Sequence, residues 1–319
     1  MNNVISIESW HDRPSPAQAL DTFLTFKKAT GAAPRTMTDY RKTVGAFFRG
    51  YEEAWNGPHT MRPSLVSWLS QDIAPATYNL RLVYLRAFWR WAVEEELQPD
   101  SPDPFRGLKR RKDRGKFRVV SLEDVKALLH GIPRGNYAGE RDRCAVAFTL
   151  DVAIRPGEML HLLPGDLDLS GLTVTIPAHV AKTREARTLP LSPGTVDVLR
   201  AFLRYRPSSW PPTVPVFASE TGRPMDTTHW GHRIKDHARR AGVDLTPYDL
   251  RHAACTLHLR AGMNTLVLQK LMGHTGPQMT MRYTHLDIDD LRDQQRASSP
   301  IEDLIPPTRE KARRRRAHR

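Results

Sequence analysis

The segment LMGHTGPQMTMRYTHL, from Leu271 to Leu286, places His274 nine residues before Tyr283. Taken alone, this segment is weak evidence of function. A tyrosine on a helix is usually a half-buried packing residue, and a histidine beside a glycine usually belongs to a turn or a cap. The segment becomes informative only together with residues more than a hundred positions earlier in the chain.

Composition limits the class of protein. The chain has 319 residues, which suggests about two domains, each large enough to bury its own core. The hydrophobic fraction of 39% and the lack of an apolar run near eighteen residues argue against a membrane span. The N-terminus does not have the regions of a secretory signal. Cys144 and Cys255 have no metal-binding or redox spacing, so we expect two buried apolar side chains in a cytoplasmic protein.

The positive charge is concentrated in two segments. Residues 106–118 contain eight cations and one aspartate, and residues 309–319 contain seven cations and one glutamate. These segments together account for the whole net charge of +13. A basic tail is often only solvated, but a basic segment between two apolar-periodic regions is well placed to follow a polyanion backbone.

The first third of the chain has the apolar spacing of helices. After a frayed terminus at 1–13, four segments, 16–31, 33–52, 60–71 and 74–96, repeat apolar residues at helical intervals. Their aromatic residues are expected in a core rather than on a stacking surface. Three prolines between Gln98 and Gly107 end this region. Residues 14–105 are therefore predicted to form a small all-helical domain.

The remainder of the chain is predicted to be mixed. Ser121 and Asp124 form the pattern of a capping box, Pro156 marks a helix start, and Ser192 is a helix cap. LTVTIP (172–177) alternates as a strand, and RTLPL (187–191) is its expected partner. Further helices are expected at about 140–153, 226–241, 248–261, 264–272 and 277–285. The fold class is mainly α with a small antiparallel sheet.

Motifs for metals, nucleotides and cofactors are absent from the sequence. There is no GxxxxGK[ST] loop, no GxGxxG after a strand and no HExxH. Several histidines occur late in the chain, but they have no acidic or cysteine helpers at ligand spacing. The sequence therefore predicts no metal site and no cofactor.

A set of cations and hydroxyls remains: Arg155, Lys182, Arg251, His274 and Tyr283. Each alone is most simply a surface or capping residue. As a set they match phosphoryl transfer, because two guanidiniums can clamp the non-bridging oxygens of a phosphodiester and a lysine can protonate a leaving alkoxide. A histidine can hydrogen-bond the same phosphate, and a tyrosine can attack phosphorus to form a covalent ester. The cations supply the charge stabilisation for which other enzymes use Mg²⁺.

Four segments in this order resemble the tyrosine recombinases of the phage integrase family, such as Xer, Cre and the catalytic half of lambda integrase. AIRPGEMLHL resembles the first-arginine motif and assigns Arg155 that role, with Glu158 at the acidic position. AKTREARTLPL resembles the lysine hairpin and assigns Lys182. TPYDLRHAACTLHL resembles the second box and assigns Arg251, and the opening segment assigns His274 and the nucleophile Tyr283.

Two positions depart from the family pattern. Tyr248 stands where the second box usually begins with histidine, and a tyrosine hydroxyl is a poor base at neutral pH. We therefore expect Tyr248 to donate a hydrogen bond to phosphate, or only to pack at a helix start. Ala153 stands where a glycine usually precedes the first arginine, and its small size predicts little effect.

The resemblance implies a C-shaped clamp on double-stranded DNA. A helical core-binding domain (14–105), a basic linker (106–118) and a mixed α+β catalytic domain (119–290) would be followed by a C-terminal segment with a basic tail (291–319). The implied enzyme is a metal- and ATP-independent DNA strand transferase that forms a 3′-phosphotyrosine. Four protomers would assemble on two sites, with accessory or directionality proteins as further partners. Residues 287–305 would dock on a neighbouring protomer. The implied location is the cytoplasm, on the nucleoid.

Two alternatives remain open at this stage. The same residues would serve a type IB-like topoisomerase or a hairpin-end resolvase, neither of which exchanges strands. The chain would also fit a DNA-binding regulator on the same scaffold that has lost catalysis, and Tyr248 is the feature that favours it.

Overall fold

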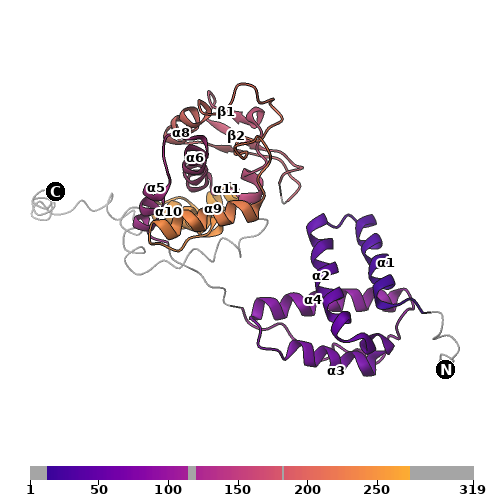
Figure 1. Cartoon of the computed structure of the whole chain (residues 1–319). Coiled ribbons are helices and arrows are strands. Elements are labelled where there is room, and N and C mark those ends of the chain that lie inside the picture. Colours follow the sequence, from indigo (N-terminus) through magenta and orange to yellow (C-terminus); the bar gives the residue numbers. More distant parts are fainter. Residues whose placement is uncertain (1–12, 114–119, 182, 274–319) are drawn as a thin grey trace, which may run out of the picture. The chain divides into compact units, whose positions relative to one another are not determined.

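The computed structural model describes residues 13–113, 120–181 and 183–273. The chain divides between Phe117 and Arg118 into two compact units, hereafter unit 1 and unit 2 (Figure 1). The described residues are mainly helical with one small antiparallel sheet, which confirms the predicted fold class. Within these ranges, no helix combines the length and the apolar character that a membrane crossing requires.

Unit 1 consists of helices, and proline opens each of its four α-helices. Proline suits a first turn because that position has no intrahelical N–H bond to lose. Ser15 adds a capping box with Gln18 before the first helix. The four predicted helices are confirmed as α1 (Pro16–Ala29), α2 (Pro34–Gly50), α3 (Pro58–Leu69) and α4 (Pro75–Glu94), with a short 3₁₀ helix, η2 (Glu52–Asn56), between α2 and α3.

Aromatic rings form the centre of unit 1. Phe88 stacks on Trp55 and Trp91 at centroid distances of 5.5 and 5.9 Å, and it meets Phe23 edge-on at 5.4 Å. All four rings are buried, so the expectation of a core role is confirmed. Edge-on and offset pairs of this kind add stability beyond the apolar area that they bury.

The segment after α4 is fixed to unit 1 well into the basic stretch 106–118. The guanidinium of Arg86 donates to the Leu108 carbonyl at 2.8 Å. Asn79 receives the Arg111 N–H at 2.8 Å and donates to the Arg111 carbonyl at 2.9 Å. The Arg111 guanidinium lies 4.0 Å from the centre of the Tyr78 ring. The part of this stretch up to Arg111 therefore belongs to the surface of α4.

In unit 2, helix α6 packs against α8 and α10, and α5 packs against α9. The capping box at Ser121 and the cap at Ser192 are confirmed. The predicted helix at 277–285 lies outside the described residues. The helices are α5 (Leu122–Gly131), α6 (Tyr137–Val152), α7 (Pro156–Met159), α8 (Pro193–Leu203), α9 (Thr227–Arg240), α10 (Pro247–Arg260) and α11 (Thr265–Met272), with a 3₁₀ turn, η3 (Pro164–Asp166).

The sheet of unit 2 has the antiparallel order β1–β2–β3. Strands β2 (Thr173–Ile176) and β3 (Arg187–Pro190) are the predicted pair, and Val174 faces Leu189 across them. The third strand, β1 (Leu167–Asp168), was not predicted from the sequence. The buried faces of β2 and β3 join the same apolar core as α6, so the hairpin is anchored in the body of unit 2.

The two cysteines are free and buried, as predicted. Burial raises the pKa of both thiols, and the pKa of Cys255 reaches about 12. A thiol in such a position is inert and serves as a small packing group.

A buried ion network links α6 to α9. Asp142 is fully buried and accepts hydrogen bonds from Arg141 Nε (2.9 Å), Arg233 Nε (2.7 Å) and His237 Nε2 (2.8 Å). Burial alone would raise the pKa of Asp142, but the His237 hydrogen bond and the two arginine charges together lower it. The network holds α6, the helix that leads directly to Arg155.

Candidate active site

Arg155 lies at the junction of α6 and α7. Helix α6 ends at Val152, its C-cap Ala153 is left-handed with a φ of 48° and a ψ of 34°, and Pro156 opens α7. This change of direction turns the Arg155 side chain back toward the end of α11. Its Nη2 donates to the Gly273 carbonyl at 2.9 Å. The side chain is 14% exposed, so solvent can still reach the guanidinium.

Arg251 comes from the middle of α10 and is buried. Thr246 and Asp249 form a capping box that fixes the start of this helix. The Arg251 guanidinium donates to the Ala153 carbonyl through Nη1 and to the Met272 carbonyl at 2.9 Å through Nη2. Arg251 therefore joins the end of α6 to the end of α11.

The two arginines thus bind consecutive carbonyls, those of Met272 and Gly273. These residues end α11, and His274 follows directly in the sequence. Gly273 has a φ of 62°, a left-handed conformation in which glycine is favoured. The geometry brings two guanidiniums from distant parts of the chain to one short backbone segment.

Glu158 and Arg187 complete the described cluster. Glu158 is buried and pairs with Arg155 (Nη1–Oε1, 3.0 Å) and with Arg187 (Nη2–Oε2, 2.5 Å). Two arginines therefore share one carboxylate, and the described cluster, with Arg251, has three guanidiniums for that one carboxylate, which leaves an excess of positive charge. Such a site favours an anion, and arginine is well suited to phosphate because it can donate two parallel hydrogen bonds.

Tyr248 is the one remaining predicted site residue that lies among the described residues. Tyr248 lies on the first turn of α10, three residues before Arg251, and its side chain is 56% exposed. This exposure argues against the alternative that Tyr248 only packs at a helix start. Lys182, His274 and Tyr283 lie outside the described residues.

The place of Arg187 in this cluster was not predicted from the sequence. A signal was present, because alternation along β3 puts Arg187 on the same face as the buried Leu189. A charged residue at a core-facing strand position needs a partner. The identity of that partner, Glu158, follows only from the tertiary fold.

The backbone of Ala153 adds a feature that its small size does not reveal. Ala153 has left-handed backbone angles, a conformation in which glycine is favoured. An alanine there bears a conformational cost that glycine avoids.

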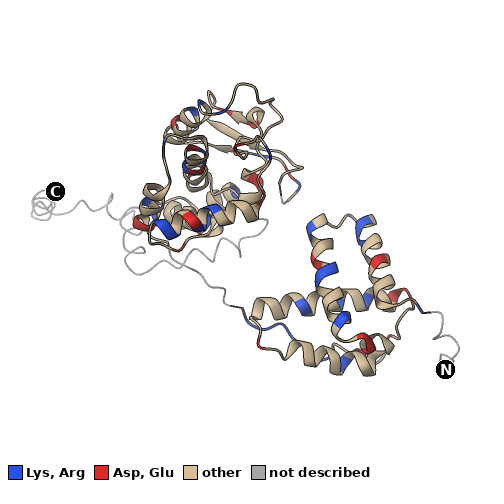
Figure 2. Ribbon diagram, in the orientation of Figure 1, with Lys and Arg blue, Asp and Glu red and all other residues tan. Residues whose placement is uncertain are grey.

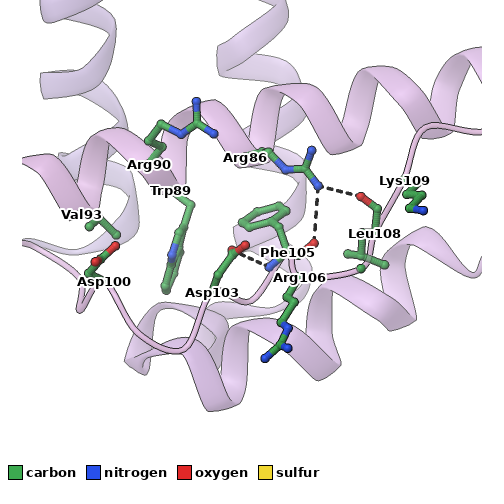
Figure 3. A pocket seen from close by; sticks show the side chains of 11 residues that line it. Arg86, Trp89, Arg90, Val93, Asp100, Asp103, Phe105, Arg106, Leu108 and Lys109 are labelled. Carbon is green, nitrogen blue, oxygen red and sulfur yellow. Dashed lines mark hydrogen bonds between the residues drawn. The ribbon is translucent and has the colours of Figure 1, made fainter.

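Unit 1 carries a separate basic surface. Figure 2 marks the Lys and Arg positions in blue on the ribbons of α1, α2 and α4. A pocket of about 530 Å³ lies between α4 and the segment that follows it (Figure 3). The cations that line it are Arg86, Arg90, Arg106 and Lys109, with Asp100 and Asp103 as the acidic residues. The Arg86 head is already bonded to backbone carbonyls, so Arg90, Arg106 and Lys109 provide the exposed charge.

Comparison with known proteins gives consistent matches. Residues 118–289 match the model of the phage integrase family. The tyrosine recombinase XerD of Pseudomonas putida is 30% identical over 86% of this chain and 93% of its own length. The tyrosine recombinase XerA of Thermococcus kodakarensis is 27% identical over 91% of this chain and 98% of its own length.

Two solved structures share the fold. One is the Tn1549 transposon integrase in complex with transposon right end DNA, with a TM-score of 0.71, 17% identity, and coverage of 89% of this chain and 99% of that one. The other is the XerH site-specific recombinase bound to its difH substrate, with a TM-score of 0.64, 17% identity, and coverage of 94% and 91%. The family match spans more than half of the chain and every position of the candidate site. The chain belongs to the phage integrase family of tyrosine recombinases.

Proposed function

We propose that this chain is a site-specific DNA recombinase that cleaves and rejoins duplex DNA through a covalent phosphotyrosine. The observation that carries the proposal is the convergence of Arg155 and Arg251 on the two carbonyls that precede His274. Relatives that are named tyrosine recombinases and match over more than nine-tenths of their length support it.

The reaction is a transesterification that conserves phosphodiester bonds. The Tyr283 oxygen attacks the scissile phosphorus, a 3′-phosphotyrosine forms, and the bond to the 5′ oxygen breaks. Lys182 gives that oxygen its proton, while Arg155 and Arg251 stabilise the charge on the non-bridging oxygens. His274 or solvent takes the proton from Tyr283. The freed 5′-hydroxyl of a partner strand then attacks the phosphotyrosine, so no ATP is consumed.

The proposal includes an assembly. Four copies of the chain would hold two DNA sites and exchange strands in pairs, on the nucleoid of the cell, with accessory proteins that set direction. The exposed cations of unit 1 support backbone contacts, and each such contact would add about 0.9 to the slope of log affinity against log salt. The two units would close on DNA as a clamp.

The nucleophile is tested with a suicide substrate, which traps the covalent adduct. Tyr283→Phe should bind its site as wild type does and form no adduct, because the substitution removes the proposed nucleophile and no cation. A covalent protein–DNA adduct formed by the variant would refute the assignment of Tyr283.

The acid is tested with sulfur in place of the 5′-bridging oxygen, because a thiolate leaves without protonation. Lys182→Ala should slow cleavage of normal DNA far more than it weakens binding. Cleavage of the sulfur substrate should recover to near the wild-type rate. If it does not recover, Lys182 only positions the phosphate.

Tyr248 is proposed to donate a hydrogen bond to a phosphate oxygen. A bond to a charged oxygen contributes roughly 1.5–3 kcal/mol, so Tyr248→Phe should slow single-turnover cleavage about ten- to a hundredfold. Tyr248→His should remain active because imidazole also donates. A Phe variant with the wild-type rate would exclude Tyr248 from the active site.

The reaction products distinguish the recombinase from its closest alternative. A recombinase joins strands from two sites, whereas a type IB-like topoisomerase relaxes supercoiled circles, and a hairpin-end resolvase seals ends. Recombined junctions from a two-site substrate support the proposal. Relaxed circles alone would favour the topoisomerase.

A further inference from the structure

Arg187 is a partly buried cation to which the proposed chemistry assigns no step. It opens β3 on the face that also carries the buried Leu189, and its side chain is 13% exposed. Its Nε is buried and has no hydrogen-bond partner among the described residues. Burial of a guanidinium is costly, and an apolar residue at a core-facing position would avoid that cost. An arginine at this position therefore calls for a role beyond the stability of the strand.

Glu158 connects Arg187 to Arg155. Its Oε1 accepts from Arg155 Nη1 at 3.0 Å and from Arg187 Nη1 at 3.3 Å, and its Oε2 accepts from Arg187 Nη2 at 2.5 Å. Arg187 thus holds both oxygens of the carboxylate. Without Arg187, Glu158 would pair with Arg155 alone. The carboxylate would then neutralise the guanidinium that has to face a phosphate.

Gly273 is the second contact of Arg187. A Cβ built on Gly273 would lie 3.0 Å from both Cζ and Nε of Arg187, so the guanidinium packs directly against this glycine. The Gly273 carbonyl is the same one that receives Arg155 Nη2. Arg187 therefore contacts both groups that hold Arg155 in place, the carboxylate of Glu158 and the backbone of Gly273.

We propose that Arg187 is a positioning residue of the active site, an inference that rests on the proposed function. It fixes Glu158 and the backbone of Gly273, and through them it sets the direction and the effective charge of Arg155. The bond-making groups stay as proposed, and Arg187 itself does not touch the phosphate.

The experiment measures two quantities on a suicide substrate: the affinity for the DNA site, and the rate of adduct formation at saturating DNA. Arg187→Gln should lower the rate about ten- to a hundredfold and change the affinity less than about threefold, since an effect on chemistry appears in the saturated rate. Arg187→Lys should be intermediate, because lysine keeps the charge but cannot make the two-pronged contact.

A double-mutant cycle tests whether Arg187 acts through Glu158. The Glu158→Gln and Arg187→Gln double variant should be no slower than the slower single variant, because residues that act through one contact are not additive. If the Gln variant at 187 is unfolded at the assay temperature, Arg187→Lys takes its place in the cycle. The matched control is Arg200→Gln, which removes an exposed arginine that pairs with Asp197 on α8 and should keep the wild-type rate.

Three results would overturn the role. They are a wild-type rate in Arg187→Gln, a defect confined to DNA affinity, and rate defects that multiply in the double variant. A wild-type chain that forms no adduct at all would overturn the proposed function and this role with it. Adduct formation by the wild type, together with a wild-type rate in the variant, would refute the positioning role alone.

Discussion

The interiors of the two units contain different kinds of buried side chain. Among the described residues, the buried polar side chains of unit 1 are Ser64 and Gln98, and its centre is a set of aromatic rings. Unit 2 instead buries Arg141, Asp142, Glu158, His237 and Arg251. Apolar burial is non-directional and tolerates changes of pH, whereas a buried charge depends on each partner. The interior of unit 2 therefore depends on specific pairings between charged side chains, and these pairings hold cations at the candidate site.

Among substitutions that test this contrast, Asp142→Asn should have the largest effect on stability. The substitution leaves Arg141 and Arg233 without their buried carboxylate, and loss of one partner of a buried pair costs about 3–5 kcal/mol. Scanning calorimetry should show a lower melting temperature for unit 2 and an unchanged transition for unit 1. A fall in both transitions would contradict the separate stability of the two interiors.

Gly273→Ala should have the second largest effect. A left-handed alanine costs about 1–2 kcal/mol, and its Cβ would also push on the Arg187 guanidinium. We expect lower stability of unit 2 and slower adduct formation, with DNA affinity unchanged. Urea unfolding and single-turnover cleavage would measure the two effects. An unaffected cleavage rate would separate the backbone at Gly273 from the active site.

Low pH should remove part of the stability that Asp142 contributes to unit 2. The pKa of Asp142 is lowered in the folded state, so its contribution is fully present above the unfolded pKa near 3.8 and is lost as pH falls through the folded value. The difference in unfolding free energy between wild type and Asp142→Asn should therefore shrink as pH falls from 5 to about 3. The control is Phe88→Ala in unit 1, whose cost of about 3–5 kcal/mol should stay constant over this range. A constant Asp142→Asn cost would show that the carboxylate is not the source of its stability.

Ala153→Gly should have the smallest effect. Glycine relieves about 1–2 kcal/mol of left-handed strain, but it adds about 0.5–1 kcal/mol of chain entropy and removes a buried methyl group. These contributions nearly cancel, so the free energy of unfolding should change by less than about 1 kcal/mol. A larger gain in stability would mean that the strain at Ala153 is a substantial cost borne by the site.

Local chemistry made much of the fold predictable. The caps at Ser121 and Ser192, the helix start at Pro156 and the alternation of β2 and β3 each act within a few residues of sequence. Strand β1 was missed because Leu167 and Asp168 are too few to show alternation. The basic stretch after Arg106 resembled a free linker, and its attachment to Asn79 depends on a contact across 32 residues.

The candidate site was predictable residue by residue but not as a set of contacts. Family motifs name Arg155 and Arg251, yet nothing in them specifies the carbonyls of Met272 and Gly273 as their partners. The pairing of Glu158 with Arg187 spans 29 residues and is fixed by how β3 packs near α7. Asp142 occurs in the charged run GERDR, which resembles an exposed helix start, and only the packing of α9 buries it.

The burial of both cysteines has a practical consequence for labelling. Burial raises the pKa of both thiols, so little reactive thiolate is present at pH 7. A cysteine introduced at an exposed position, such as Val66→Cys in unit 1 or Leu266→Cys in unit 2, would react with maleimide dyes while the native thiols stay silent. A pair of dyes on the otherwise native chain can therefore follow the distance between the two units by energy transfer as DNA is bound and cut.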